Sequence, residues 1–119
     1  AEFGVKFVAN SVITSETMMK EHPKTVEKFL SALLKGWEAA MAIENEKACL
    51  DAVKKKDKGN NDTIRQKQLT VTRTLIKPSK QIRIGTLDFD AWNQTEAVML
   101  KEKQIKKAVN IKDKLIPLK

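Results

Sequence analysis

The clearest pattern along the chain is an apolar stripe that follows Pro23. Lysines, glutamates and a serine fill most of the positions between its members. The apolar residues recur at the spacing of one face of an α-helix. The pattern therefore predicts a long amphipathic helix with a buried face, formed by Val26, Phe29, Leu30, Leu33, Leu34, Trp37, Ala40 and Met41.

A short helix is predicted immediately before this stripe. Ser15 is a good N-cap, and Glu16 is favourable near the positive end of a helix. His22 precedes a proline, which disfavours helical backbone at that residue. Pro23 itself suits the first position of a new helix. The sequence therefore predicts a break at His22 and a new start at Pro23.

Three more helical segments follow. Residues 45–56 predict a helix with Ala48, Cys49, Ala52 and Val53 facing inward. Asp62 is the predicted cap of the next helix, which ends before Pro78. Asp88 is the predicted cap of a last long helix, and the stretch NIKDKLI predicts a short terminal turn. The apolar positions of the last helix are Phe89, Trp92, Ala97, Met99 and Leu100.

Residues 5–14 carry a different pattern. Their alternation and β-branched side chains predict one long strand near the N-terminus. A single strand is not stable alone, and the only rival segment, KQIRIGT at 80–86, is short. We therefore expect a mainly α chain with one strand whose partners are missing or come from another molecule. An unpaired edge of this kind predicts a strand-mediated homodimer.

The charge balance is strongly basic. The formal net charge is +8, and 20 of the 23 basic residues are lysines. Such a balance permits binding to an anionic partner, although a solvated lysine-rich surface is the preferred interpretation. The scarcity of arginine counts against readout of bases, since arginine makes the commonest specific base contact. A small basic helical module that binds nucleic acid remains the alternative function.

The motif search gives no catalytic site. There is no phosphate-binding glycine loop, no metal-ligand spacing and no nucleophile elbow. Cys49 is the only cysteine, so the chain has no disulfide of its own, and His22 has no motif around it. We expect a non-enzymatic protein with no metal and no cofactor. No run of 18 apolar residues is present that would predict a membrane-spanning helix.

Some residues allow two interpretations. Trp37 and Trp92 could stack on a ligand ring, but their helical spacing favours packing. The lysines of KKKDKGNND, at 54–62, could bind an anion or simply favour a helix C-terminus. Asp88 and Asp90 lie two positions apart and do not face each other on a helix, so they are not expected to act as a catalytic pair.

Taken in order, these motifs resemble the C-terminal portion of a known protein family. The first part shows Ser15 after a strand pattern, then His22-Pro23, then Gly36-Trp37. The later part shows Gly85, Asp88, Trp92 and Val109-Asn110-Ile111. The arrangement is similar to the nitrate/sulfonate/taurine and thiamine-precursor group of ABC-transporter substrate-binding proteins.

The resemblance implies a fold and a domain organisation. Residues 1–119 would be the C-terminal part of a solute-binding domain, a fragment of a two-lobed α/β periplasmic-binding-protein fold of type II, without its N-terminal half. Glu2-Phe3 is what an EcoRI cloning site encodes, which is consistent with a vector remnant at residues 1–3.

The resemblance also implies a function. The chain would bind a small anionic or heterocyclic solute, such as a sulfonate or a thiamine precursor, for an ABC permease. No nucleic acid partner is expected. The protein would be periplasmic or extracellular, and lipid-anchored in a Gram-positive source. Asn10 and Ser11, where the strand would approach the cleft, are the expected ligand-binding residues.

Overall fold

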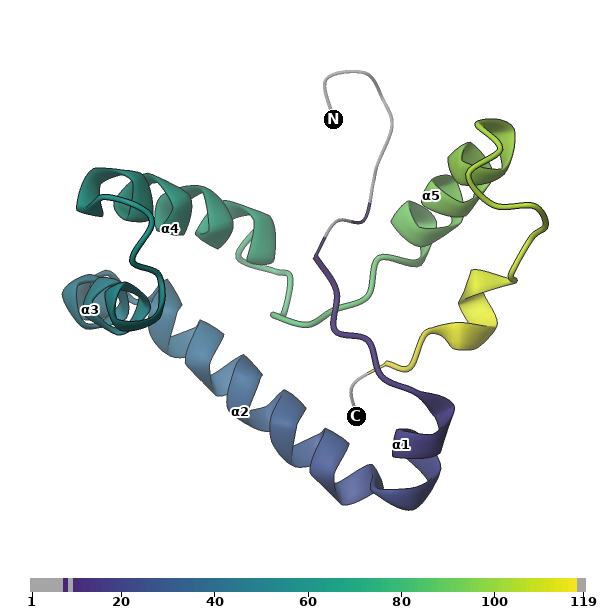
Figure 1. The fold of residues 1–119 in the computed structure, drawn as a ribbon, viewed down its shortest axis with the longest axis horizontal. Coiled ribbons are helices and arrows are strands. Elements are labelled where there is room, and N and C mark those ends of the chain that lie inside the picture. Colours follow the sequence, from purple (N-terminus) through teal and green to yellow (C-terminus); the bar gives the residue numbers. More distant parts are fainter. Residues whose placement is uncertain (1–7, 9, 118–119) are drawn as a thin grey trace. The chain divides into compact units, whose positions relative to one another are not determined.

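The described part of the chain is helical wherever its secondary structure is regular. The computed structural model describes residue 8 and residues 10–117. Figure 1 shows the helices in chain order. They are α1 (Glu16–Glu21), α2 (Pro23–Met41), the 3₁₀ turn η1 (Ile43–Asn45), α3 (Glu46–Lys56), α4 (Asp62–Ile76), α5 (Phe89–Lys101) and the 3₁₀ turn η2 (Ile111–Lys114).

The described residues contain no strand, so the predicted N-terminal strand is wrong. Residue 8 and residues 10–14 have no regular secondary structure, and the rest of the 5–14 segment lies outside the described residues. Residues 80–86, the only rival segment, form turns and a bend and contain no strand. A strand needs a paired neighbour, and alternating β-branched residues do not supply one.

This finding also corrects the expected fold class. The described residues form a helical structure and do not bear out a fragment of an α/β fold. The homodimer predicted from the strand is untested, and it has lost the strand on which it was based.

The chain divides into two compact units. One unit comprises residues 15–85 and holds α1, α2, η1, α3 and α4. The other comprises residues 1–14 together with residues 86–119, and holds α5 and η2. Among the described residues, no helix is both long and apolar enough to span a bilayer.

The junction between α1 and α2 confirms the local predictions. The Ser15 hydroxyl accepts the Met18 N–H at 3.0 Å, as expected of an N-cap. His22 leaves the helical region at φ −133° and ψ 47°, and Pro23 is the first residue of α2. The break therefore occurs where the proline restricts the preceding residue.

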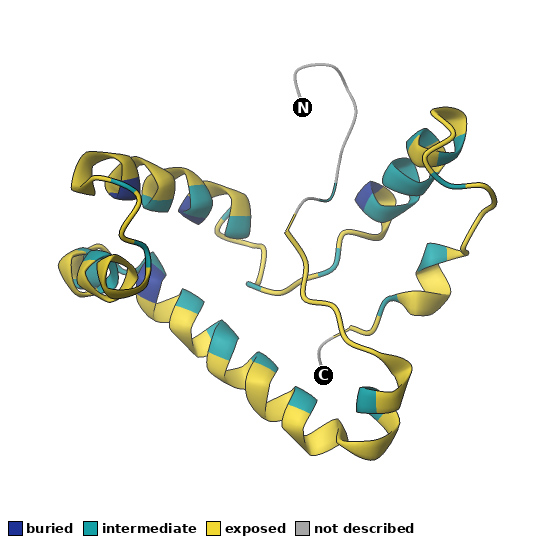
Figure 2. Ribbon diagram, viewed as in Figure 1, coloured by how far each residue is buried: buried dark blue, intermediate teal, exposed yellow. Residues whose placement is uncertain are grey.

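The apolar stripe lies on one face of α2, but it is not deeply buried. Ala40 is buried, Phe29 is 57% exposed, and the other six residues of the stripe are half-buried (Figure 2). No large side chain among the described residues is fully buried. The helix prediction is therefore confirmed, whereas the predicted burial is only partial.

Helices α3 and α4 are joined by residues 57–61 and pack against each other in the same unit. The end of α3 contacts the start of α4 through Lys54–Asp62, and the start of α3 contacts the later turns of α4 through Glu46–Arg73, so the two helices run in opposite directions. Cys49 and Leu50 of α3 are half-buried, but Ala48, Ala52 and Val53 are exposed, which corrects the predicted inward face. The α4 cap is also shifted by one residue. Asn61 accepts the Ile64 N–H at 2.9 Å, and Asp62 is the first helical residue.

In the unit of residues 1–14 and 86–119, α5 is the central element. Asp88 accepts the Ala91 N–H at 2.9 Å and is the predicted cap. The Val8 N–H donates to the Thr95 hydroxyl oxygen at 3.1 Å, which joins the N-terminal segment to α5. Ala91 is the buried residue of the helix. The predicted terminal turn is η2.

Candidate functional site

A cluster of polar contacts in the unit of residues 15–85 surrounds Arg73 of α4. Its Nε donates to the Ala40 carbonyl at 2.7 Å, and its Nη1 donates to Glu46 Oε2 at 2.7 Å. Nη2 reaches the Ala42 carbonyl at 3.5 Å. The Nε contact satisfies the Ala40 carbonyl, one of the last carbonyls of α2, which lack partners within the helix. Arg73 therefore joins α4 to the corner between α2 and α3.

Glu46 is held in its charged form at this corner. The hydrogen bond from Arg73 and a weaker contribution from the Gln66 amide hold the pKa of Glu46 below its ordinary value. Hydrogen bonds to the charged form of a carboxylate favour that form and disfavour its protonation. Glu46 is therefore a structural anion and a poor candidate for a general base.

A second arginine of α4 is buried in the loop between α3 and α4. Nη1 of Arg65 donates to Asp62 Oδ1 at 2.8 Å, and Nη2 donates to the Asp57 carbonyl. Its Nε lies 3.8 Å from Asp57 Oδ2, and among the described residues that nitrogen has no hydrogen-bond acceptor. The two aspartates balance the charge of this arginine.

The same loop lowers two carboxyl pKa values. The Asn60 side chain, followed by the Gly59 N–H, lowers the pKa of Asp57. The Lys54 ammonium, and to a smaller extent the Arg65 guanidinium, lower the pKa of Asp62. Both carboxylates thus have fixed partners within the loop and its flanking helices.

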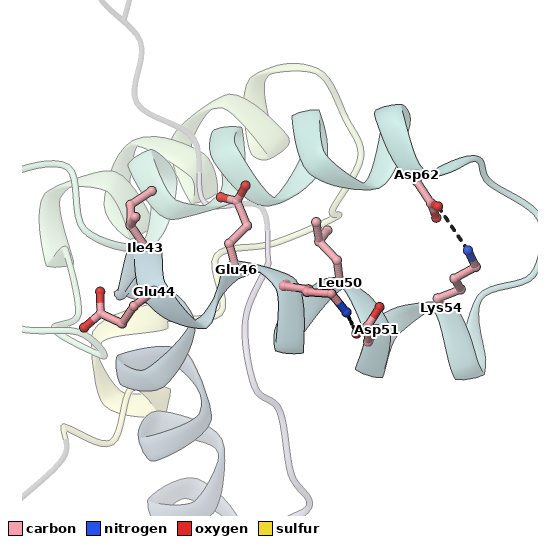
Figure 3. A pocket seen from close by; sticks show the side chains of 8 residues that line it. Ile43, Glu44, Glu46, Leu50, Asp51, Lys54 and Asp62 are labelled. Atoms are coloured by element: carbon pink, nitrogen blue, oxygen red, sulfur yellow. Dashed lines mark hydrogen bonds and ion pairs between the residues drawn. The ribbon is translucent and has the colours of Figure 1, made fainter.

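The larger of two pockets is charged and lies along η1, α3 and the start of α4. It has a volume of about 420 Å³, and most of its lining side chains are labelled in Figure 3. Lys47 pairs with Asp51 at 2.8 Å and Lys54 pairs with Asp62 at 3.0 Å, as the dashed lines show. Glu46 is also paired, with Arg73, so most of the charged side chains that line this pocket form ion pairs within the protein. The lining is Ile43, Glu44, Glu46, Lys47, Leu50, Asp51, Lys54 and Asp62.

The smaller pocket is mainly apolar and lies among α2, α3 and α4. It has a volume of about 160 Å³. Trp37 comes from α2, and the cysteine of the chain comes from α3. The lining is Trp37, Cys49, Leu50, Val53, Arg65, Gln68, Leu69 and Thr72.

The two residues expected to bind ligand are accessible. Asn10 lies in a bend and Ser11 follows it, and both side chains are exposed. They belong to the unit of residues 1–14 and 86–119. Neither residue lines either pocket described above.

The other residues considered from the sequence have mainly structural positions. His22 is exposed at the α1–α2 break. Trp92 is half-buried on α5, and Asp90 is exposed in the first turn after the Asp88 cap. In the described part of the chain, no group of three or more histidine, cysteine, aspartate or glutamate side chains is placed to hold a metal ion.

The lysine run at the end of α3 is mostly solvated. Lys54 is paired with Asp62, whereas Lys55, Lys56 and Lys58 are exposed. Three of these lysines lie in the last turn of α3, where positive charge is favourable.

Sequence reasoning missed Arg65 and Arg73, because arginine is rarely buried. A signal was present in their spacing. They lie eight positions apart, with Leu69 midway, so all three fall on one face of α4.

Comparison with known proteins gives one partial match. A family model described as NMT1/THI5 like matches residues 1–47. This span includes Asn10, Ser11, α1, α2 and η1. No curated protein and no solved structure matches the chain. The match supports a relation between this part of the chain and the nitrate/sulfonate/thiamine-precursor binding family, which is a family of binding proteins.

Proposed function

We propose that the chain is part of the solute-binding component of an ABC importer. The observation that carries the proposal is the NMT1/THI5-like match over residues 1–47. The solute would be a small anion or heterocycle, with sulfonates and thiamine precursors as the first candidates. The physiological partner would be the ABC permease, and the protein would work in the periplasm or outside the cell.

The matched segment has features that suit this role. It contains the α1–α2 junction, where Ser15 and Pro23 fix the start of each helix. The apolar face of α2 stays half-exposed along most of its length. A face of this kind is suited to packing against further protein. We propose that residues 1–119 correspond to the C-terminal part of a solute-binding domain.

Asn10 and Ser11 are the proposed ligand contacts. An amide and a hydroxyl can donate and accept hydrogen bonds, which suits both an anionic oxygen and a ring nitrogen. Both side chains are exposed and lie within the matched span. Their polarity and accessibility support the assignment.

A ligand screen tests the proposal. The full polypeptide encoded by the reading frame that contains these residues is screened by thermal shift against nitrate, alkyl sulfonates, pyrimidines and related heterocycles. We expect at least one solute to raise the melting temperature, because a ligand that binds only the folded state stabilises it. A screen in which no solute raises it would refute the function.

The site assignment has its own control. Asn10→Ala and Ser11→Ala should each reduce the shift, whereas Ser31→Ala, on the exposed side of α2, should not. If both site variants keep the full shift, the assigned contacts are wrong even though the function stands.

A further inference from the structure

The smaller pocket has an apolar wall built from three helices. Trp37 of α2 and Leu69 of α4 line it, together with Cys49, Leu50 and Val53 of α3. It is partly open to solvent and has a volume of about 160 Å³. All of its lining residues belong to the unit of residues 15–85. The walls are therefore placed by helices within a single unit.

One side of the pocket is polar and comes only from α4. Gln68 and Thr72 line it and lie four positions apart, on one face of the helix. Among the described residues, neither side chain has a hydrogen-bond partner. An amide and a hydroxyl are thus available to a bound molecule.

The pocket offers no net positive charge to an anion. Arg65 is 5% exposed and lines the pocket, but its guanidinium pairs with both Asp57 and Asp62. These contacts also fix the side chain, so it cannot turn inward and fill the space. Two carboxylates around one guanidinium disfavour an additional anion.

The volume limits the size of the occupant. Sites for drug-sized ligands are usually about 300–1,000 Å³, whereas an engineered apolar cavity of about 150 Å³ binds benzene. The space therefore suits one ring. The Trp37 indole favours an aromatic ring, because aromatic pairs gain energy beyond the area that they bury.

We propose that this pocket binds an uncharged, single-ring aromatic compound that carries one hydrogen-bonding group on its edge. The ring lies against Trp37 and Leu69, and the polar group bonds to the half-buried Thr72 hydroxyl, with the Gln68 amide one turn away on the same face. This site is separate from Asn10 and Ser11. It does not depend on the proposed transport function, because its test uses no transported solute.

The experiment uses the 119-residue chain with Trp92→Phe, which leaves Trp37 as its single tryptophan. Benzyl alcohol is the probe and Trp37 fluorescence is the readout. We expect a saturable change in emission. Cys49 lines the pocket and is the single cysteine, so alkylation by iodoacetamide reports on this site alone. Its alkylation should slow several-fold at saturating probe, because the bound probe covers the thiol. A change that grows linearly without saturation, or alkylation at an unchanged rate, would overturn the proposal.

Matched variants locate the binding. Leu69→Trp fills the pocket and should abolish protection of Cys49 from alkylation. Val71→Trp adds the same bulk on the same helix at a residue that is 57% exposed, and should leave protection intact. Equal protection in the two variants would place the probe elsewhere and overturn the assignment.

Two further comparisons of probe affinity test the ligand class, and neither needs the bulky Leu69→Trp substitution. Thr72→Val should weaken benzyl alcohol about fivefold and leave toluene unchanged, because only the alcohol loses a hydrogen bond. Benzoate should bind at least about tenfold more weakly than benzyl alcohol, since it brings a charge to a neutralised site. Equal affinity for benzoate, or no effect of Thr72→Val, would overturn the proposed ligand class.

Discussion

Arg73 Nη1 of α4 donates to Glu46 Oε2 of α3 across 2.7 Å, while Nε of the same guanidinium donates to the Ala40 carbonyl of α2. One side chain thus joins three helices. Among the described residues, the buried apolar side chains are those of Ala40 and Ala91. Because alanine buries little area, this polar junction contributes more to holding the helices than arginine usually does.

Removing this junction should destabilise the unit of residues 15–85. Arg73→Met keeps the helical propensity and much of the stem, but it removes every hydrogen bond of the guanidinium. We expect the free energy of unfolding to fall by about 2–4 kcal/mol, because the partner carboxylate and a helix-end carbonyl lose their donor. Urea unfolding followed by far-ultraviolet circular dichroism measures the change.

The matched control is Lys67→Met on the same helix. Lys67 is exposed, so this variant should change the free energy of unfolding by less than about 0.5 kcal/mol. Equal stability of the two variants would show that Arg73 does not hold the corner.

The two alanines at the end of α2 should respond differently to added volume. Ala40 is buried and its carbonyl accepts from Arg73, whereas Ala39 is exposed. Ala40→Leu should cost about 1–3 kcal/mol through overpacking, and Ala39→Leu should cost much less. Thermal unfolding of the pair checks the prediction, and an equal loss in both variants would contradict the described packing.

The sequence predicted the helices well where local chemistry decides their limits. Ser15, Pro23 and Asp88 mark helix starts, and the structure confirms each one. Caps depend on side chains within a few residues, so they can be recognised from sequence alone. The shift from Asp62 to Asn61 shows the remaining ambiguity when two capping residues are adjacent.

Features that depend on distant contacts were harder to predict. The 5–14 strand was wrong because pairing requires a second strand, which local alternation does not reveal. The inward face of α3 was wrong at Ala48, Ala52 and Val53, because small and β-branched residues fit either face of a helix. The pocket at Trp37 was not predicted either, since it forms only where three helices meet.

The C-terminal segment should depend on the charge of Glu96. This carboxylate accepts the N–H groups of Val109 at 2.5 Å and of Asn110 and Ile111 at 3.1 Å. The Ile111 N–H, followed by the Val109 N–H, lowers the pKa of Glu96 from its ordinary value of 4.5. A lowered pKa means that the stabilisation is present above about pH 4.5 and is lost as the pH falls through the lower, folded value.

Amide resonances measure this dependence. Above about pH 4.5, Glu96→Gln should speed hydrogen exchange at the amides of Val109–Ile111. The same substitution should remove the acid transition in the chemical shift of the Ile111 amide. Glu102→Gln, at an exposed position of the same segment, should leave both unchanged. An acid transition that persists in Glu96→Gln would rule out this carboxylate as the anchor.

The most direct test of the central claim is titration calorimetry of the full polypeptide that contains these residues. The titrants are a sulfonate, nitrate and a pyrimidine, followed by a DNA duplex at low salt. The account predicts saturable one-to-one binding of at least one small solute and no binding of DNA. No heat with any solute, together with tight binding of DNA that weakens steeply as salt is added, would contradict it.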